Sequence, residues 1–302
     1  MQIVLLIVAA IILACSAALA QSPVTFSQSG LLKLESLSLN GTRQDFIFGA
    51  ADMAVRFRVS DQFKIGGDLG VDSLQLDGQR GGTVFATGVI EGAYGKLSVG
   101  IPRLVMPQVF DVPAIGGSEV LGVVQGLASG ELLRFMSYFT AAPTMRGLRY
   151  DAQFDKILVA ASVQELGSKD RMIHAIAATY DLGDYKFSLG RADVDLGPCI
   201  ATTTKIALRV QKGRTRGGVV GSHQNLMGSW EDTVNGFVAY AVTDHLTVEG
   251  QVFDMITPSD SYLAWGADVI YRLKSGLFVQ AGVAQLNPSA DRLVTLSLGF
   301  AY

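Results

Sequence analysis

Histidine and cysteine, the residue types that form many nucleophilic and metal sites, are scarce in this chain of 302 residues. It contains three histidines, His174, His223 and His245, and two cysteines, Cys15 and Cys199. These residues do not have the clustered spacing of a metal site. A Ca²⁺ ion held by loop carboxylates remains open, although no motif supports it. We therefore expect no cofactor.

Charge is also sparse. Charged residues make up 17% of the chain and the formal net charge is −3. The sequence has no basic block or stripe, so nucleic acid is not an expected partner. The run Arg216-Gly217-Gly218 has no strand-to-helix context and indicates a turn, not a phosphate-binding loop.

Long apolar runs are missing after the first twenty residues, and no later segment is apolar enough to cross a membrane as a helix. Residues 3–14 are uninterrupted apolar sequence, and Ala18-Leu19-Ala20 supplies the small residues of a cleavage site. We predict that residues 1–20 are a signal peptide and that 21–302 form the mature chain. Two alternatives remain: lipidation at Cys15, or an uncleaved anchor, which would be shorter than the ~20 residues of a spanning helix.

The histidines do not predict an enzyme. Hydrolysis requires a nucleophile and a base held by an orienting partner. His245 lies in a predicted tight turn. His223 follows Ser222, and adjacent strand residues point to opposite faces, so these two side chains cannot pair. We expect no catalytic residues.

What the sequence has instead is alternation of apolar and polar residues from Val24 onward. Between Met53 and Ser60 the odd positions are apolar, and the even positions include Arg56 and Arg58. The segments 63–72, 205–211, 246–252 and 263–273 alternate in the same way. A period of two predicts strands with one apolar and one polar face.

A soluble sandwich would bury the apolar face, whereas a membrane barrel would turn it to lipid. Two features favour the barrel. Tight turns alternate with connections that we expect to be longer, as at the two ends of an outer-membrane barrel. Aromatic residues stand beside turns, where an interfacial girdle belongs: Tyr94, Phe154, Tyr180, Tyr185 and Tyr271. We predict an all-β, transmembrane antiparallel barrel of about sixteen strands, the first at 30–40.

Residues 102–136 interrupt the alternation. This segment contains Pro102, Pro107 and Pro113, the pair Gly116-Gly117 and few charges. A long irregular segment inside a compact domain is usually functional. We predict a loop folded into the barrel lumen that narrows a pore, with short helices after residue 118 whose N-caps are Ser118 and Ser129.

The segments 60–66, 82–85, 95–100, 177–185 and 265–302 resemble, in the same order, the general porins of the α-proteobacterial, Rhodobacter type. The last strand, 294–302, ends in the aromatic Tyr302, which resembles an outer-membrane insertion signal. The resemblance implies that 102–136 is the constriction loop of a homotrimer. It also implies a Gram-negative outer membrane, lipid contact, and passage of small hydrophilic solutes and ions. The chain departs from the family because its loop has few acidic residues.

A pore selects by its diameter and by the charges at its narrowest section. The candidate loop residues are Arg103, Asp111, Glu119, Glu131 and Arg134. The candidate wall residues, chosen by strand parity, are Lys33, Arg56, Arg58, Arg149, Lys205 and Arg209. We expect Lys33, Arg56 and Arg58 to cluster opposite the loop, which would favour anions mildly. The alternative is that Glu35, Asp68, Glu91 and Glu249 balance these charges.

A different class of function also remains open. An inward loop that blocks the barrel would leave a structural barrel, an anchor or adhesin, without general diffusion activity.

Overall fold

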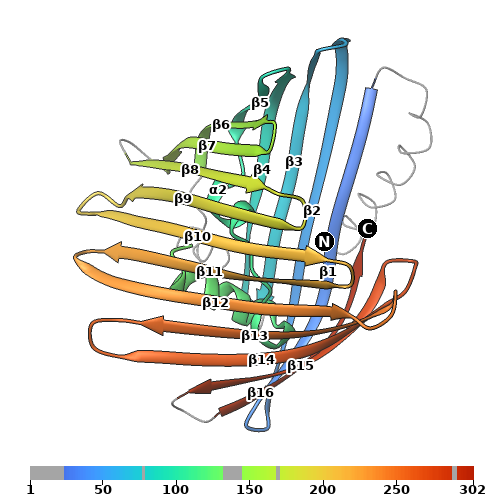
Figure 1. Ribbon diagram of the computed structural model, residues 1–302, viewed down its shortest axis with the longest axis vertical. Helices are drawn as coiled ribbons and strands as arrows, with labels where there is room; N and C mark the ends of the chain where they lie inside the picture. Colours follow the sequence, from blue (N-terminus) through green and yellow to red (C-terminus); the bar gives the residue numbers. More distant parts are fainter. Residues whose placement is uncertain (1–23, 77–78, 132–144, 168–170, 288–290) are drawn as a thin grey trace.

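The computed structural model of the protein describes residues 24–76, 79–131, 145–167, 171–287 and 291–302. Sixteen antiparallel strands form one closed barrel, in which each strand pairs with its sequence neighbours and the first pairs with the last (Figure 1). The predicted all-β fold and strand count are confirmed. The predicted signal peptide and Arg134 lie outside the described residues.

The first eight strands are β1 (Val24–Leu39), β2 (Thr42–Ser60), β3 (Phe63–Leu76), β4 (Gln79–Gly92), β5 (Gly95–Ile101), β6 (Met145–Phe154), β7 (Ile157–Leu166) and β8 (Met172–Asp181). The other eight are β9 (Tyr185–Asp195), β10 (Ile200–Lys212), β11 (Thr215–Leu226), β12 (Ser229–Ala241), β13 (Leu246–Ile256), β14 (Ser261–Arg272), β15 (Leu277–Asn287) and β16 (Asp291–Ala301). Between β5 and β6 lie α2 (Val105–Val109), the short 3₁₀ helix η1 (Ile115–Gly117) and α3 (Glu119–Ala128). None of the helices described is long and apolar enough to cross a membrane.

The alternation of the sequence places apolar side chains on the outside of the barrel. Phe57 and Val59 on β2 are 49% and 59% exposed, and Ile206 and Leu208 on β10 are exposed as well. Inward positions of the same strands hold polar residues, such as Lys205. The predicted faces of these strands are therefore confirmed, with the apolar face outward.

Two expectations were wrong: the start of the first strand, and longer connections at the end of the barrel away from the termini. β1 begins at Val24 rather than 30, because Ser27 and Gln28 do not interrupt its pairing with β2. The turn after β4 is Ala93–Tyr94, and Gly95 and Lys96 begin β5. Several connections at the other end are as tight as those at the end with the termini: Asn40–Gly41 joins β1 to β2, and Met227–Gly228 joins β11 to β12.

The barrel closes between β1 and β16. Leu31 pairs with Ala301, and the ladder continues to Leu39 and Leu293. Backbone hydrogen bonds join Gly30 and Tyr302 in both directions, at 3.0 and 3.1 Å. Gly30 has no Cβ, and the Tyr302 ring lies where one would be. The C-terminal aromatic thus lies on the seam of the barrel.

Candidate functional site

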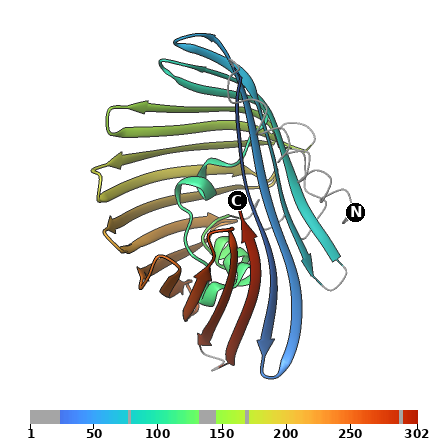
Figure 2. The ribbon, with the colours of Figure 1, turned by 90° about the vertical axis from the view of Figure 1, so that its right-hand side faces the viewer.

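The segment after β5 crosses the interior of the barrel. Figure 2 shows α2 and α3 inside the ring of strands. α2 contacts β7, β8 and β9, whereas η1 contacts β13, β14, β15 and β16. The described part of the predicted loop, residues 102–131, therefore lies inside the barrel, with α2 against β7–β9 and η1 against β13–β16.

Apolar packing holds the loop on these strands. Val105, Met106 and Phe110 are buried against small wall residues such as Ala160, Ala175, Ala177 and Ala207. Ile115 packs with a second group on the wall: Leu37, Phe46, Phe253, Ala264, Ala284 and Leu293. The expectation of a polar, wet interior was therefore wrong for this part of the wall, because the apolar loop covers it. This packing also explains why the loop is rich in valine and leucine.

Glycines allow the loop backbone to touch the wall. Gly116 and Gly117 have φ of +59° and +68°, a region that disfavours other residues. Gly266 and Gly282 face Gly116 so closely that a Cβ on either would overlap its backbone. The Gly116 carbonyl accepts a hydrogen bond from Thr295 Oγ1 at 2.5 Å, and its N–H donates to Gln251 Oε1 at 3.2 Å. The η1 segment is thus held against four strands, β13 to β16.

The start of α3 is held by a buried polar group on β1. Ser118 caps the helix, as predicted, by accepting from the Leu121 N–H at 3.3 Å. Its hydroxyl donates to Glu35, and the Glu119 N–H donates to the same carboxylate at 2.9 Å. Lys33 donates to the Gly117 carbonyl at 2.6 Å and lies 3.4 Å from Glu119. Lys33, predicted as a pore-wall charge, is 2% exposed and lies beneath the loop.

A second buried ion pair holds the end of α3. Lys205 Nζ lies 2.7 Å from Glu131 Oε1, and the two side chains are 1% and 6% exposed. Ser129 was predicted as an N-cap, but it is the C-cap of α3, because its N–H donates to carbonyls of the helix. Its hydroxyl accepts from Asn235 on β12. Lys205 and Glu131 thus both serve to dock the loop.

Two arginines of the wall bind loop groups. Arg209 donates to the carbonyls of Val109 and Asp111, at 2.7 and 2.6 Å. Arg149 donates to the Arg103 carbonyl at 3.2 Å and to the Gln108 side chain. Two of the four predicted wall arginines, Arg149 and Arg209, therefore contact the loop, and both donate to its backbone oxygen atoms.

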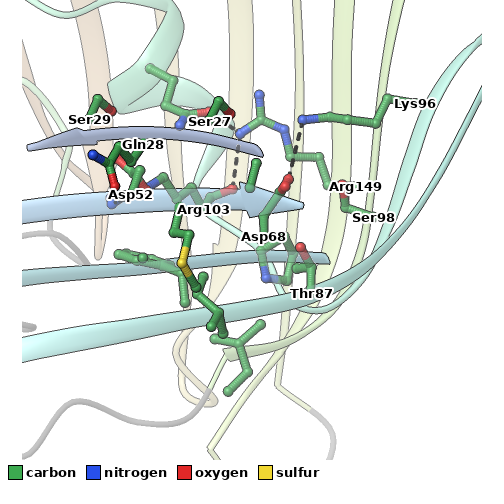
Figure 3. A pocket seen from close by; sticks show the side chains of 18 of the residues that line it. Ser27, Gln28, Ser29, Asp52, Asp68, Thr87, Lys96, Ser98, Arg103 and Arg149 are labelled. Carbon is green, nitrogen blue, oxygen red and sulfur yellow. Dashed lines mark hydrogen bonds and ion pairs between the residues drawn. The ribbon is translucent and has the colours of Figure 1, made fainter. Parts of the chain in front are cut away.

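A cavity of about 420 Å³ remains between the start of the loop and the strands β1–β6. Figure 3 shows Asp52, Asp68, Lys96, Arg103 and Arg149 around this space. The hydroxyls of Ser27, Ser29, Thr87 and Ser98 also line it. Charged and hydroxyl groups thus line this space together with apolar side chains such as Leu69 and Phe85.

Arg103 is the loop residue at the centre of this lining. Its guanidinium lies 2.7 Å from Asp52 Oδ1 and 2.8 Å from Asp72 Oδ2, and its Cζ lies 4.2 Å from the centre of the Phe85 ring. Burial works to lower the pKa of Arg103, but hydrogen bonds and charge from Asp72 and Asp52 outweigh it and raise that pKa. Arg103 therefore stays charged.

Together with Arg103, Asp52 and Asp72, the other charged residues in and beside the cavity make up a set of ion pairs that we call the cavity network. Arg56 lies 2.6 Å from Asp68 and 3.4 Å from Glu91, and Lys96 lies 3.7 Å from Asp68. The network holds equal numbers of cations (Arg56, Lys64, Lys96, Arg103, Arg149) and carboxylates (Asp52, Asp68, Asp72, Glu91, Asp151).

The predicted cluster of Lys33, Arg56 and Arg58 does not form. Arg56 lies opposite Thr25 on β1, eight residues before Lys33. Lys33 contacts η1, Arg56 lines the cavity, and Arg58 is exposed near the turn after β2. The alternation correctly gave all three the same parity, but long, staggered strands separate them along the barrel.

Sequence reasoning missed Asp52, Asp72 and Lys96 as site residues. Asp52 and Asp72 share strand parity with Arg56 and Asp68, which was the available signal. Their role depends on Arg103 reaching back from the loop to β2 and β3, which no local pattern shows.

Other chemistry finds little support. Ser222 is buried on the inner face, whereas His223 is exposed outside and lies 2.7 Å from Asp232. The predicted opposite orientation of these neighbours is confirmed. Within the described ranges, no group of three or more histidine, cysteine, aspartate or glutamate side chains could hold a metal ion. Cys199 is a free, half-buried thiol.

The architecture is that of a porin-like barrel: sixteen strands with a helical loop inside. No family model and no curated protein matches the chain. Solved structures do match. One is the trimer form of OmpT, an outer membrane protein of Vibrio cholerae, with a TM-score of 0.68 and 14% identity over 92% of this chain and 99% of that one. Another, solved as a porin, has a TM-score of 0.66 and 16% identity over 92% and 100%.

A mutant of the Rh. blastica porin is also similar, with a TM-score of 0.66 and 11% identity over 92% of this chain and 100% of that one. At these identities the likeness concerns the fold. The chain shares the whole porin barrel with these proteins.

Proposed function

We propose that this protein is an outer-membrane porin that passes small hydrophilic solutes and ions by passive diffusion, without catalysis. The carrying observation is the closed barrel, apolar outside, with a charged cavity beside the loop inside it. Such a barrel leaves no unpaired strand edge in lipid and surrounds a polar interior. The similarity to porins supports the same conclusion. It also supports a Gram-negative outer membrane, to which residues 1–20 would direct the chain.

The proposed constriction loop is 102–136. Its charged residues divide into two groups by position. Glu119 and Glu131 pair with Lys33 and Lys205 at the wall, whereas Arg103 lines the cavity. Solutes would therefore pass between the start of the loop and β1–β6, and the docked helices would narrow the rest of the lumen.

The outer face of β2 supports the proposed homotrimer. Its outward residues are all non-polar over the stretch 47–59, and Ile47 and Phe57 are exposed. This exceeds the ~9–11 residues with which a strand crosses a bilayer. On β13, by contrast, the outward residues are non-polar only over the stretch 246–252, and the next outward residue is Asp254. Excess apolar surface around β2 would be covered by another copy of the chain.

Planar bilayers test the proposal. The purified, folded protein should produce stable steps of conductance that close in three equal parts, and heat-denatured protein should produce none. Liposome swelling with sugars of increasing size would then give the diameter of the pore. A silent bilayer with a folded barrel would contradict the porin proposal and favour a plugged, structural barrel.

A further inference from the structure

The Arg103 side chain is bound by residues of three strands, β2, β3 and β4. Asp52 of β2 and Asp72 of β3 bind its nitrogen atoms, and the Phe85 ring of β4 lies under its guanidinium. Gly70 of β3 leaves the room: a Cβ there would lie 2.6 Å from Asp52 Oδ1 and 2.9 Å from Arg103 Nη2. Such a bound, stacked guanidinium is held more rigidly than a mobile surface arginine.

The ion pairs of Arg103 join a positive charge on the loop to two negative charges on the wall. The loop supplies the cation, and the wall supplies the carboxylates of Asp52 and Asp72. All other charges of the cavity network already pair with each other through β2–β6. Without Arg103 the network would hold one more carboxylate than cation, and the uncompensated charge would face the cavity.

We propose that Arg103 is the residue that sets the ion selectivity of this pore, because it completes the balance of five cations and five carboxylates, so that the lumen discriminates weakly between cations and anions. This inference rests on the proposed porin function. It replaces the mild anion preference expected from a cluster of Lys33, Arg56 and Arg58, because Lys33 is buried under the loop and Arg56 is paired with Asp68 and Glu91. Size, rather than charge, would then decide which solutes pass.

The test is the reversal potential of single pores in a salt gradient centred on the order of 0.1 M, where charges act over about 10 Å. The wild type should give a cation-to-anion permeability ratio near unity. Arg103→Gln should raise that ratio roughly fivefold, the attraction expected of one unit charge at contact distance in water. Arg103→Lys, which keeps the charge, should remain near the wild type.

Two further variants separate charge from structure. The double variant Arg103→Gln/Asp72→Asn restores equal numbers of cations and carboxylates, so its ratio should return toward unity. Arg191→Gln removes an arginine that pairs with Asp193 on the outer face of β9, and it should change nothing. Folding of each variant is checked by its electrophoretic mobility before and after heating.

The outcomes are distinct. If Arg103→Gln alters conductance or noise but not the permeability ratio, Arg103 only holds the loop and the inference is wrong, while the porin function stands. If the double variant stays as cation-selective as the single one, the carboxylates are not the source of selectivity. A folded wild type that does not conduct contradicts the porin function itself, and the inference with it.

Discussion

Lys205 and Glu131 show how much a single buried charge can matter. Both side chains are almost fully buried, and they join β10 to the end of α3. Removing one partner of a buried pair leaves an uncompensated charge, at a cost of about 3–5 kcal/mol. We predict that Lys205→Met lowers the free energy of unfolding by about that amount, measured by denaturant unfolding in detergent.

The matched control is Lys186→Met. Lys186 pairs with Asp181 in a solvent-exposed position, and such pairs contribute at most about 1 kcal/mol. The double variant Lys205→Met/Glu131→Leu should recover most of the lost stability, because neither charge remains buried. Equal losses for Lys205→Met and Lys186→Met would show that the pair does not dock the loop.

For the candidate site, the sequence predicted which charged side chains point into the barrel. Alternation gave the inward direction of Lys33, Arg56, Arg149, Lys205 and Arg209. It could not tell which of these face water, since that depends on where the loop lies. Lys33 and Lys205 are covered because η1 and α3 pack over β1 and β10. A contact between residues as distant in the chain as Lys33 and Gly117 has no local signal.

The docked loop depends on glycine where it meets the wall. Gly282 of β15 faces the Gly116 carbonyl, with no room for a Cβ between them. We predict that Gly282→Ala displaces η1 and costs about 1–3 kcal/mol, as overpacking of a tight contact does. The measurement is the unfolding midpoint, together with current noise in bilayers, which should rise as the loop loosens.

Gly250→Ala is the control for that change. Gly250 also lies within a strand, but the nearest atom to its added Cβ would be a Val238 methyl at 4.0 Å. Stability and noise should stay close to the wild type. Similar noise in both variants would argue that the η1 contact does not immobilise the loop.

The elements themselves were predicted well, and the causes of the errors are specific. Period-two alternation gave sixteen strands because each strand separates an apolar exterior from the interior. The N-cap at Ser118 followed from its position before an apolar run. Ser129 was misassigned because α3 ends there, and the same residue type can bind either end of a helix. The sequence contains no local pattern that predicts which strands of the barrel the apolar loop packs against.

Across the whole barrel, the long apolar face of β2 predicts how copies associate. Ile47 lies at one end of this face, which is longer than the ~9–11 residues with which a strand crosses a bilayer. We predict that Ile47→Asp leaves the barrel folded but converts trimers to monomers, seen by analytical ultracentrifugation in detergent. Glu165→Gln, an outward substitution on β7, should leave the trimer intact. Trimers that survive Ile47→Asp would place the contact elsewhere.

The seam between Gly30 and Tyr302 has a consequence for biosynthesis. Because β1 pairs with β16, an intermediate that lacks the last strand leaves the backbone hydrogen-bonding groups on one edge of β1 unpaired. The two edges remain open until the chain is complete, and open edges invite aggregation. Contacts between the ends of a chain also form slowly. We therefore expect the unfolded chain to need protection from aggregation until β1 and β16 have paired.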